Sequence, residues 1–295
     1  VSHLHAVLDS PALREAYNAN LPKITQYWTE LGHNAALFTK YKELRRSAEF
    51  GALSPARRRI VENALRDFKL SGAELGAEGK KRFGTIQEEL SRLAQEIAQE
   101  LVIKTGQRCT AIRRVFAPKD RLEALLKATQ KRLEALRLGD PREEGVDLGP
   151  LASLEQKAEV EKAVAALLEA GARVYWRHPG REDGAFFPPT LLLAEDPWPG
   201  ALHQVEPFGP VATFFPYGSR EEAARLAALG GGSLVATLAT SDPEEARFYL
   251  LALAPYVGRL HLLNARTAAS STGHGSPLPR LLHGGPGRAG GGEEL

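Results

Sequence analysis

A change of periodicity near residue 97 is the feature that most constrains the fold of this chain. Before it, apolar residues recur at helical spacing and no run has the character of a strand. After residue 111, short apolar runs alternate with helical stretches, which is typical of a parallel α/β sheet. We therefore predict an α/β protein with an all-helical segment over residues 1–96 and a parallel-sheet domain over residues 97–295.

Capping signals place the helices of the first segment. Ser10-Pro11 and Ser54-Pro55 each combine an N-cap serine with a proline in the first turn. Gly32 and Gly72 follow the ends of apolar patterns, where glycine commonly stops a helix. We expect helices over residues 10–21, 24–31, 35–50, 54–71 and 78–97. The last pattern continues through the change of character, so one continuous helix could cross it.

Strand-like runs in the second part are short and lie between helix signals. We expect strands over residues 112–117, 172–176, 187–193, 210–216, 234–239 and 258–263. Helices are expected over residues 118–137, 154–170, 221–228 and 242–253. The run 210–216 is largely apolar, which indicates a strand buried on both faces.

Cys109 is the only cysteine of the chain, and it lies in a turn beside arginines. Positive charge and backbone N–H groups favour the thiolate, and a thiolate can attack a carbonyl group to form a covalent intermediate. The alternative is a small buried hydrophobic residue, which is the commoner setting of a free cysteine. A single cysteine also excludes an internal disulfide and suits a reducing compartment, so we expect a cytoplasmic location.

Several motifs occur in a fixed order after residue 97: Gly106-Gln107-Arg108-Cys109, Leu148-Gly149-Pro150-Leu151, Glu206-Pro207-Phe208-Gly209-Pro210 and His283-Gly284-Gly285-Pro286-Gly287-Arg288. With them, residues 97–295 resemble the catalytic domain of the aldehyde dehydrogenase superfamily. The tail is similar to that of the ring-cleavage enzymes of phenylacetate degradation.

This resemblance implies an NAD- or NADP-dependent oxidoreductase whose nucleophile, Cys109, attacks a small aldehyde. It implies that Glu206 contacts the nicotinamide ribose and that Phe208 lies in the cofactor cleft. The alternative for these two residues is a loop carboxylate and a core aromatic ring. His274 and His283 lie in the Gly- and Pro-rich tail. A histidine base near Cys109 is an alternative to solvated loop histidines, but no spacing argument favours it.

Residues 1–95 resemble a different family. The stretch Glu62-Asn63-Ala64-Leu65-Arg66-Asp67-Phe68, with Leu13-Arg14-Glu15-Ala16-Tyr17 before it, is similar to the N-terminal helical region of oligopeptidase A, a thimet-type zinc metallopeptidase. The chemistry of that family needs a His-Glu-x-x-His helix, and the sequence contains none. We therefore expect no metal site and no peptidase activity. We interpret the chain as a hybrid of two fragments that join near residues 94–101.

In the aldehyde dehydrogenase family, the place of residues 1–96 belongs to a dinucleotide-binding domain. The sequence there has no strand, glycine-rich turn and helix in succession. The resemblance implies that the general-base glutamate and an amide of the oxyanion site lie in the missing domain. We therefore expect aldehyde oxidation by this chain alone to be impaired or absent. The alternatives are a non-enzymatic hybrid or designed fusion, and a metallopeptidase-related fragment without activity.

Charge and composition exclude some partners. The chain has 38 basic and 36 acidic residues, so its net charge of +2 gives no electrostatic case for nucleic acid or an acidic membrane. No apolar run approaches the roughly 20 residues that span a bilayer. Methionine is absent even at position 1, which fits a fragment, a processed product or a designed sequence. We expect the chain to self-associate, because the apolar stripes that contain Leu65, Phe68, Phe83 and Leu90 should be left partly exposed to solvent.

Overall fold

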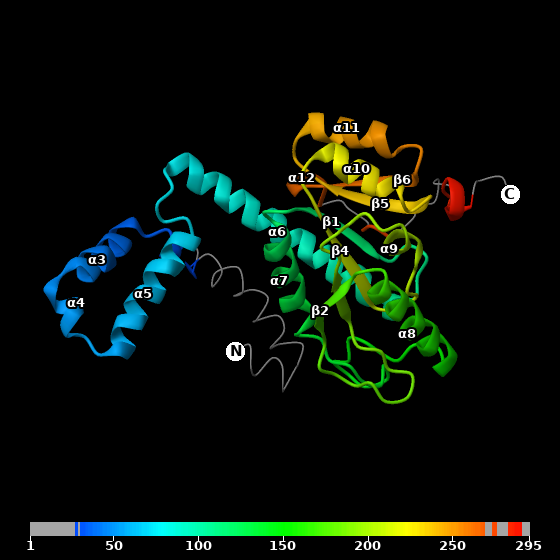
Figure 1. Ribbon diagram of the computed structural model, residues 1–295, viewed down its shortest axis with the longest axis horizontal. Helices are drawn as coiled ribbons and strands as arrows, with labels where there is room; N and C mark the ends of the chain where they lie inside the picture. The colour runs from blue at the N-terminus through cyan, green and yellow to red at the C-terminus, as the bar shows by residue number, and fades with distance from the viewer. Residues whose placement is uncertain (1–26, 29, 269–272, 276–282, 291–295) are drawn as a thin grey trace. The chain divides into compact units, whose positions relative to one another are not determined.

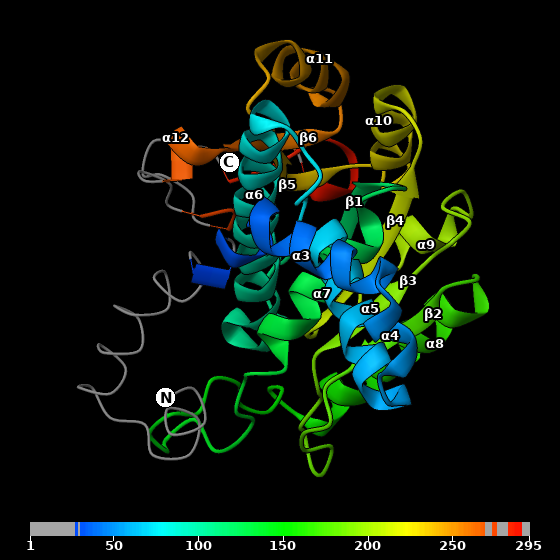
Figure 2. The same cartoon turned by 90° about the vertical axis from the view of Figure 1, so that its left-hand side faces the viewer.

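The structure is a computed structural model that describes residues 27–28, 30–268, 273–275 and 283–290. The chain forms two compact units, Val1–Glu88 and Glu89–Leu295 (Figures 1 and 2). The helices predicted over 10–21 and at the start of 24–31 lie outside the described residues. None of the described helices is long and apolar enough to cross a membrane.

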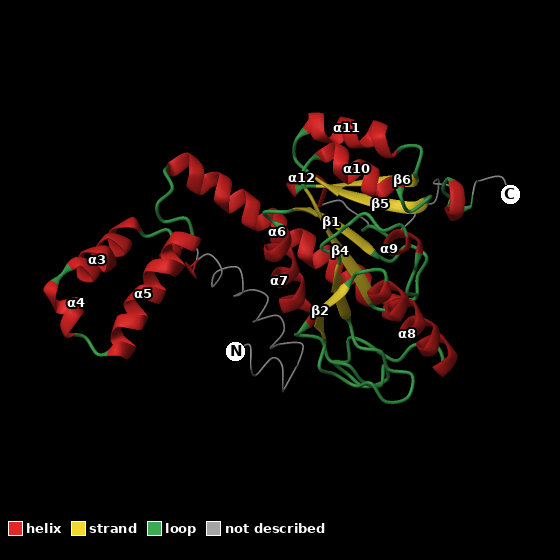
Figure 3. Cartoon of the chain, viewed as in Figure 1, coloured by secondary structure: helices red, strands yellow, loops and turns green. Residues whose placement is uncertain are grey.

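The first unit is helical over its described residues, without a strand (Figure 3). It contains α3 (Ala35–Arg46), α4 (Ala48–Ala52), α5 (Pro55–Leu70) and the start of α6 (Ala77–Val102). The predicted cap of α5 is confirmed, since Ser54 accepts a hydrogen bond from the backbone N–H of Arg57. One helix was expected over 35–50, but Ser47 is extended and divides it. The Ser47 hydroxyl donates to the carbonyl of Leu44, as a short polar side chain can at a helix end.

The core of the first unit is aromatic. Phe38, Phe68 and Ala73 form its buried cluster, and the rings of Phe38 and Phe68 lie 5.6 Å apart. The prediction that Phe68 is left partly bare is therefore wrong, because α3 and α5 pack their aromatic faces together. Ile60, also in α5, is 62% exposed.

One continuous helix, α6, crosses the point near residue 97 where the character of the sequence changes, which confirms that prediction. Its residues from Glu89 onward belong to the second unit, where Ala94, Ile97 and Leu101 are fully or almost fully buried. They pack in one cluster with α7 (Leu122–Leu133) and the main sheet. A short turn of 3-10 helix, η1 (Ile103–Gly106), follows α6.

The main sheet has the order β1-β4-β3-β2. Its strands are β1 (Arg114–Pro118), β2 (Arg173–Arg177), β3 (Thr190–Leu193) and β4 (Val211–Tyr217). Strands β1, β4 and β3 are parallel, as predicted, whereas β2 is antiparallel to β3. The exception has a local cause. Residues 178–189 join β2 to β3 without a helix, so the chain turns back instead of crossing over.

Helices cover both faces of this sheet. In β4, Ala212 and Phe214 face the cluster with α6 and α7, whereas Val211 and Phe215 face the cluster with α8 (Leu154–Glu169). This alternation confirms that the apolar run 210–216 is buried on both sides. The short helix α9 (Ala201–Gln204) precedes β4.

A second, two-stranded sheet pairs β5 (Ser233–Ala239) with β6 (Val257–Leu263) in parallel. Helices α10 (Arg220–Ala228) and α11 (Pro243–Leu253) lie together on one side of it (Figures 1 and 2). Asp242 caps α11 by accepting a hydrogen bond from the N–H of Glu244 at 2.8 Å. The short elements α12 (Ala265–Ala268) and η2 (Gly287–Ala289) follow.

Candidate active site

The turn before Cys109 has an unusual backbone. Lys104, Thr105 and Gly106 have φ values of 53°, 55° and 69°, so three successive residues are left-handed. This conformation costs a residue with a side chain about 1–2 kcal/mol. At Gly106, a Cβ atom would also lie 2.4 Å from the carbonyl oxygen of Gly209. Only glycine fits there, and the sharp turn fixes the direction in which the chain enters the Cys109 loop.

Hydrogen bonds of the Arg113 and Gln107 side chains fix the loop that contains Cys109. Arg113 donates hydrogen bonds to the carbonyls of Gly106, at 2.5 Å, and Gly209, at 2.8 Å. It also donates to the carbonyl of Arg108 at 3.2 Å. The Gln107 side chain accepts a hydrogen bond from the N–H of Ala152 at 2.9 Å. The position of Cys109 is therefore set by contacts with the loops that precede α8 and β4.

Arg113 also sets the charge around the thiol. Burial lowers the pKa of Arg113 to about 10, against the opposing effect of Glu206 and Cys109. That value leaves the guanidinium charged at neutral pH. The loop therefore combines a constrained thiol with a permanent cation.

Cys109 is exposed, and its Sγ atom lies 3.6 Å from Nε2 of His283. His283 is exposed as well, but it is paired with the thiol and not simply solvated. In the sequence, a histidine base near Cys109 is an alternative that no spacing favours. The only available signal was the position of His283 at the head of the Gly-rich tail motif.

Glu206 and Phe208 lie beside the same arginine. One carboxylate oxygen of Glu206 lies 3.8 Å from Nε of Arg113, and the other lies 3.6 Å from a guanidinium nitrogen of Arg288. The first distance is too long for a hydrogen bond but forms an ion pair. The ring centre of Phe208, 39% exposed, lies 5.5 Å from the Arg113 guanidinium. Arg113 thus links the two predicted cofactor residues to the Cys109 turn.

A buried polar network supports the other side of the loop. Glu100 forms an ion pair with Arg108 at 3.2 Å and accepts a hydrogen bond from the N–H of Gly275. The hydroxyl of Thr110 donates to the carbonyl of Gly275 at 3.4 Å. Residues on either side of Cys109 are therefore tied to the segment 273–275 and to the last turns of α6.

His274 is the centre of this network. Its Nδ1 lies 2.7 Å from the hydroxyl of Thr237, and its backbone N–H donates to Glu96 at 2.9 Å. Burial, with the nearby His261, Arg259 and Arg108, lowers the pKa of His274 to about 3. The imidazole is therefore neutral in the folded chain. Instead of the solvated loop histidine expected from the sequence, His274 is a buried structural residue.

We expect the second unit to lose stability as the pH falls below the pKa of an unfolded histidine. The folded pKa is depressed, so the unfolded chain binds this proton more readily. Between pH 7.5 and 5 the free energy of unfolding should fall by about 2 kcal/mol from His274. Burial raises the pKa of Glu100, which acts in the opposite direction. Urea unfolding at both pH values should therefore compare the wild type with His274→Gln. Equal pH dependence in the two proteins would contradict the assignment.

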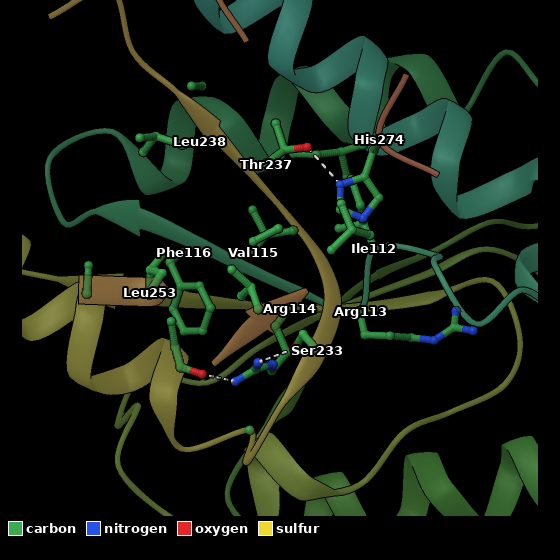
Figure 4. A pocket seen from close by; sticks show the side chains of 18 of the residues that line it. Ile112, Arg113, Arg114, Val115, Phe116, Ser233, Thr237, Leu238, Leu253 and His274 are labelled. Atoms are coloured by element: carbon green, nitrogen blue, oxygen red, sulfur yellow. Dashed lines mark hydrogen bonds between the residues drawn. The ribbon is translucent and has the colours of Figure 1, made fainter. Parts of the chain in front are cut away.

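A cavity of about 930 Å³ lies in the second unit, and Cys109 is part of its lining. Sites for small molecules commonly have volumes of roughly 300–1,000 Å³. Figure 4 shows that Val115 and Phe116 of β1, Leu238 of β5 and Leu253 of α11 line this cavity. It also shows the hydrogen bond between Thr237 and His274. The lining is largely apolar on the β1 side and polar near His274. In the described ranges, no three His, Cys, Asp or Glu side chains are grouped to hold a metal ion.

Two family models match the chain. That of the aldehyde dehydrogenase family matches residues 45–273, and that of the Neurolysin/Thimet oligopeptidase N-terminal domain matches residues 1–82. Both resemblances inferred from the sequence are thereby confirmed. The ranges overlap over 45–82, where the structure is helical with short connections.

The chain is similar to curated proteins over part of their length. It is 51% identical over 153 residues to protein MaoC of Klebsiella aerogenes, covering 50% of this chain and 45% of that protein. It is 38% identical over 206 residues to the 3,4-dehydroadipyl-CoA semialdehyde dehydrogenase of Aromatoleum evansii, covering 67% of this chain and 40% of that one. The chain thus spans less than half the length of these relatives.

Solved structures show the same fold. Glyceraldehyde-3-phosphate dehydrogenase from Methanocaldococcus jannaschii, solved with NADP, has a TM-score of 0.59 at 21% identity, over 68% of this chain and 41% of that one. Betaine aldehyde dehydrogenase from Staphylococcus aureus, solved with NAD+, has a TM-score of 0.59 at 21% identity. The match covers 68% of this chain and 38% of that one. Because the family match covers most of its residues, this chain belongs to the aldehyde dehydrogenase family.

Proposed function

We propose that the second unit is the catalytic portion of an aldehyde dehydrogenase in which Cys109 adds to the carbonyl carbon of a small aldehyde. The observation that carries the proposal is a thiol held in a constrained turn, beside the charged Arg113 and on the wall of a cavity. Addition forms an Sγ–C bond while the carbonyl oxygen gains a proton, which gives a thiohemiacetal.

The proposed substrate class is a semialdehyde of aromatic-ring degradation, such as those of the phenylacetate pathway. The tail motif supports this choice, as does the semialdehyde dehydrogenase activity for which the Aromatoleum evansii relative is named. We also retain a cytoplasmic location, where a single thiol would stay reduced. Self-association is retained as well, since Ile60, Leu70 and Leu251 are each more than 60% exposed.

The residues of this chain do not fit a nicotinamide cofactor well. The described part of the first unit, residues 27–28 and 30–88, is helical and lacks the strand and glycine-rich turn that bind dinucleotide phosphates. Glu206, which the resemblance assigns to the nicotinamide ribose, is ion-paired with both Arg113 and Arg288. We therefore propose no hydride transfer by this chain alone and expect neither NAD nor NADP to bind tightly.

The test is acylation of Cys109 by p-nitrophenyl acetate, followed by mass spectrometry, because this reaction needs no cofactor. We expect the thiol to react on the order of 100-fold faster than a free cysteine peptide, the gain typical of a positioned acid–base partner. The acyl group should be absent from Cys109→Ala. Labelling no faster than that of the peptide would favour a non-enzymatic hybrid. Formation of NADH or NADPH from an aldehyde by the chain alone would contradict the cofactor part of the proposal.

A further inference from the structure

We propose that His283 is the proton acceptor and donor for Cys109, taking the thiol proton when the sulfur is acylated and returning it when the acyl group is released to water. The inference rests on the proposed nucleophile and adds a catalytic residue to it. It starts from the 3.6 Å separation between Sγ of Cys109 and Nε2 of His283. A base at this distance is within the range of a hydrogen bond to sulfur, as a nucleophile and its activating base require.

Several contacts fix the segment that carries His283. The N–H of Gly285 donates to the carbonyl of Gly290 at 2.8 Å, and the N–H of Arg288 donates to the carbonyl of Gly231 at 3.0 Å. The Arg288 guanidinium donates to the carbonyl of Gln204 at 2.8 Å. At Gly258 of β6, an added Cβ would lie 1.9 Å from the carbonyl oxygen of Gly284, so strand and segment are in close contact. The imidazole is therefore presented to the thiol by an anchored segment.

The surroundings of His283 differ from those of two buried histidines, His203 and His274. His203 lies in a ring stack with Phe116 and Phe215, and its Nε2 lies 2.6 Å from the carbonyl of Pro197. Burial lowers the pKa of His203, as it does that of His274. His283 is exposed, so its ring can exchange protons with water and face an incoming ester. Only His283 among these three combines exposure with contact to a nucleophile.

The proposed cycle balances without an oxidant or reductant. Neutral His283 accepts the thiol proton at Nε2, and Sγ attacks the ester carbonyl carbon. The S–C bond forms, the C–O bond to the alcohol breaks, and the imidazolium gives its proton to the departing alkoxide. Water then gives a proton to Nε2 while its oxygen bonds to the acyl carbon. The C–S bond breaks, and the proton returns to sulfur.

Arg113 complements this pair. Its guanidinium interacts electrostatically with Cys109 and stays charged near neutral pH, with a pKa of about 10. It places a positive charge near Cys109 but cannot act as a base, because it has no proton-accepting atom. Positive charge and proton transfer are therefore assigned to two different side chains.

The experiment measures acylation of Cys109 by p-nitrophenyl acetate in the full chain, with the variants His283→Ala and His283→Gln. Both should acylate on the order of 100-fold more slowly than the wild type, because neither alanine nor glutamine can accept the thiol proton. Glutamine keeps a polar group at the position and so separates proton transfer from simple polarity. Added imidazole should restore much of the rate in His283→Ala, and Cys109→Ala should measure the uncatalysed background. His33→Ala, in the first unit, is the matched control and should acylate at the wild-type rate.

The outcomes separate the two proposals. Fast acylation in both the wild type and His283→Ala would overturn the role of His283 and leave Cys109 in place. Slow acylation of the wild type, equal to a cysteine peptide, would overturn the proposed function itself. A slow His283→Ala that imidazole does not restore, or a His283→Gln as fast as the wild type, would also overturn the role of His283. Circular dichroism of each variant should match the wild type, since His283 is exposed.

Discussion

Replacement of Gly106 by alanine is expected to slow acylation of Cys109 on the order of 100-fold, because a shift of about 1 Å in a reacting group has effects of that size. The new Cβ would lie 2.4 Å from the carbonyl oxygen of Gly209, and φ at this position is 69°. Arg113 binds the carbonyls of both glycines, so neither backbone segment can move away without breaking those hydrogen bonds.

The same substitution should lower the free energy of unfolding of the second unit by about 2–5 kcal/mol, from backbone strain and overpacking together. Urea unfolding followed by the fluorescence of Trp176 and Trp198 measures it. Gly200→Ala is the matched control, since its φ is −59° and its nearest neighbour, Nε2 of Gln204, would lie 3.8 Å away. Wild-type stability and reactivity in Gly106→Ala would show that the two loops do not approach closely.

Phe214→Ala should cost the second unit about 3–5 kcal/mol of unfolding free energy, the range for truncation of a buried phenylalanine. Phe214 is fully buried in β4, which pairs with β1 on one side and β3 on the other. Its side chain joins the cluster formed with α6 and α7. The substitution would therefore leave a new cavity where the main sheet, α6 and α7 meet. No one of these elements could fill it by shifting alone.

The control for this experiment is a large apolar residue outside the core. Leu251 of α11 is 67% exposed, so Leu251→Ala should change the unfolding free energy by less than about 0.5 kcal/mol. Denaturant unfolding of both variants under one set of conditions provides the comparison. A loss for Phe214→Ala as small as that for Leu251→Ala would contradict the central position of β4.

Local signals in the sequence predicted most of the elements. The cap at Ser54 opens α5 as expected, and α11 begins where the helix over 242–253 was expected, because such start signals depend only on the next few residues. The apolar run 210–216 became the central strand β4, whose burial pattern needs helices on both faces. The continuous helix α6 likewise follows from an apolar pattern that is not interrupted at the join between the two families.

Features that depend on distant residues were not predictable in the same way. The antiparallel direction of β2 and the division of the strands into two sheets depend on how connections pack. The burial of Phe68 depends on its partner Phe38, thirty positions away in another helix. Cys109 could be singled out because it is unique, but no spacing rule relates it to His283. Roles for Cys109, Glu206 and Phe208 remain predictions.

The sequence separation of Cys109 and His283 has a consequence for the order of folding. The two residues are 174 positions apart, so their contact closes a very long loop and is among the slower kinds to form. During synthesis the cysteine is made long before the histidine. Under the role proposed for His283, we expect the thiol to react like that of an unfolded chain until β6 and residues 283–290 have docked. In a refolding experiment, the rate at which Cys109 becomes fast-reacting would measure the rate of this docking step.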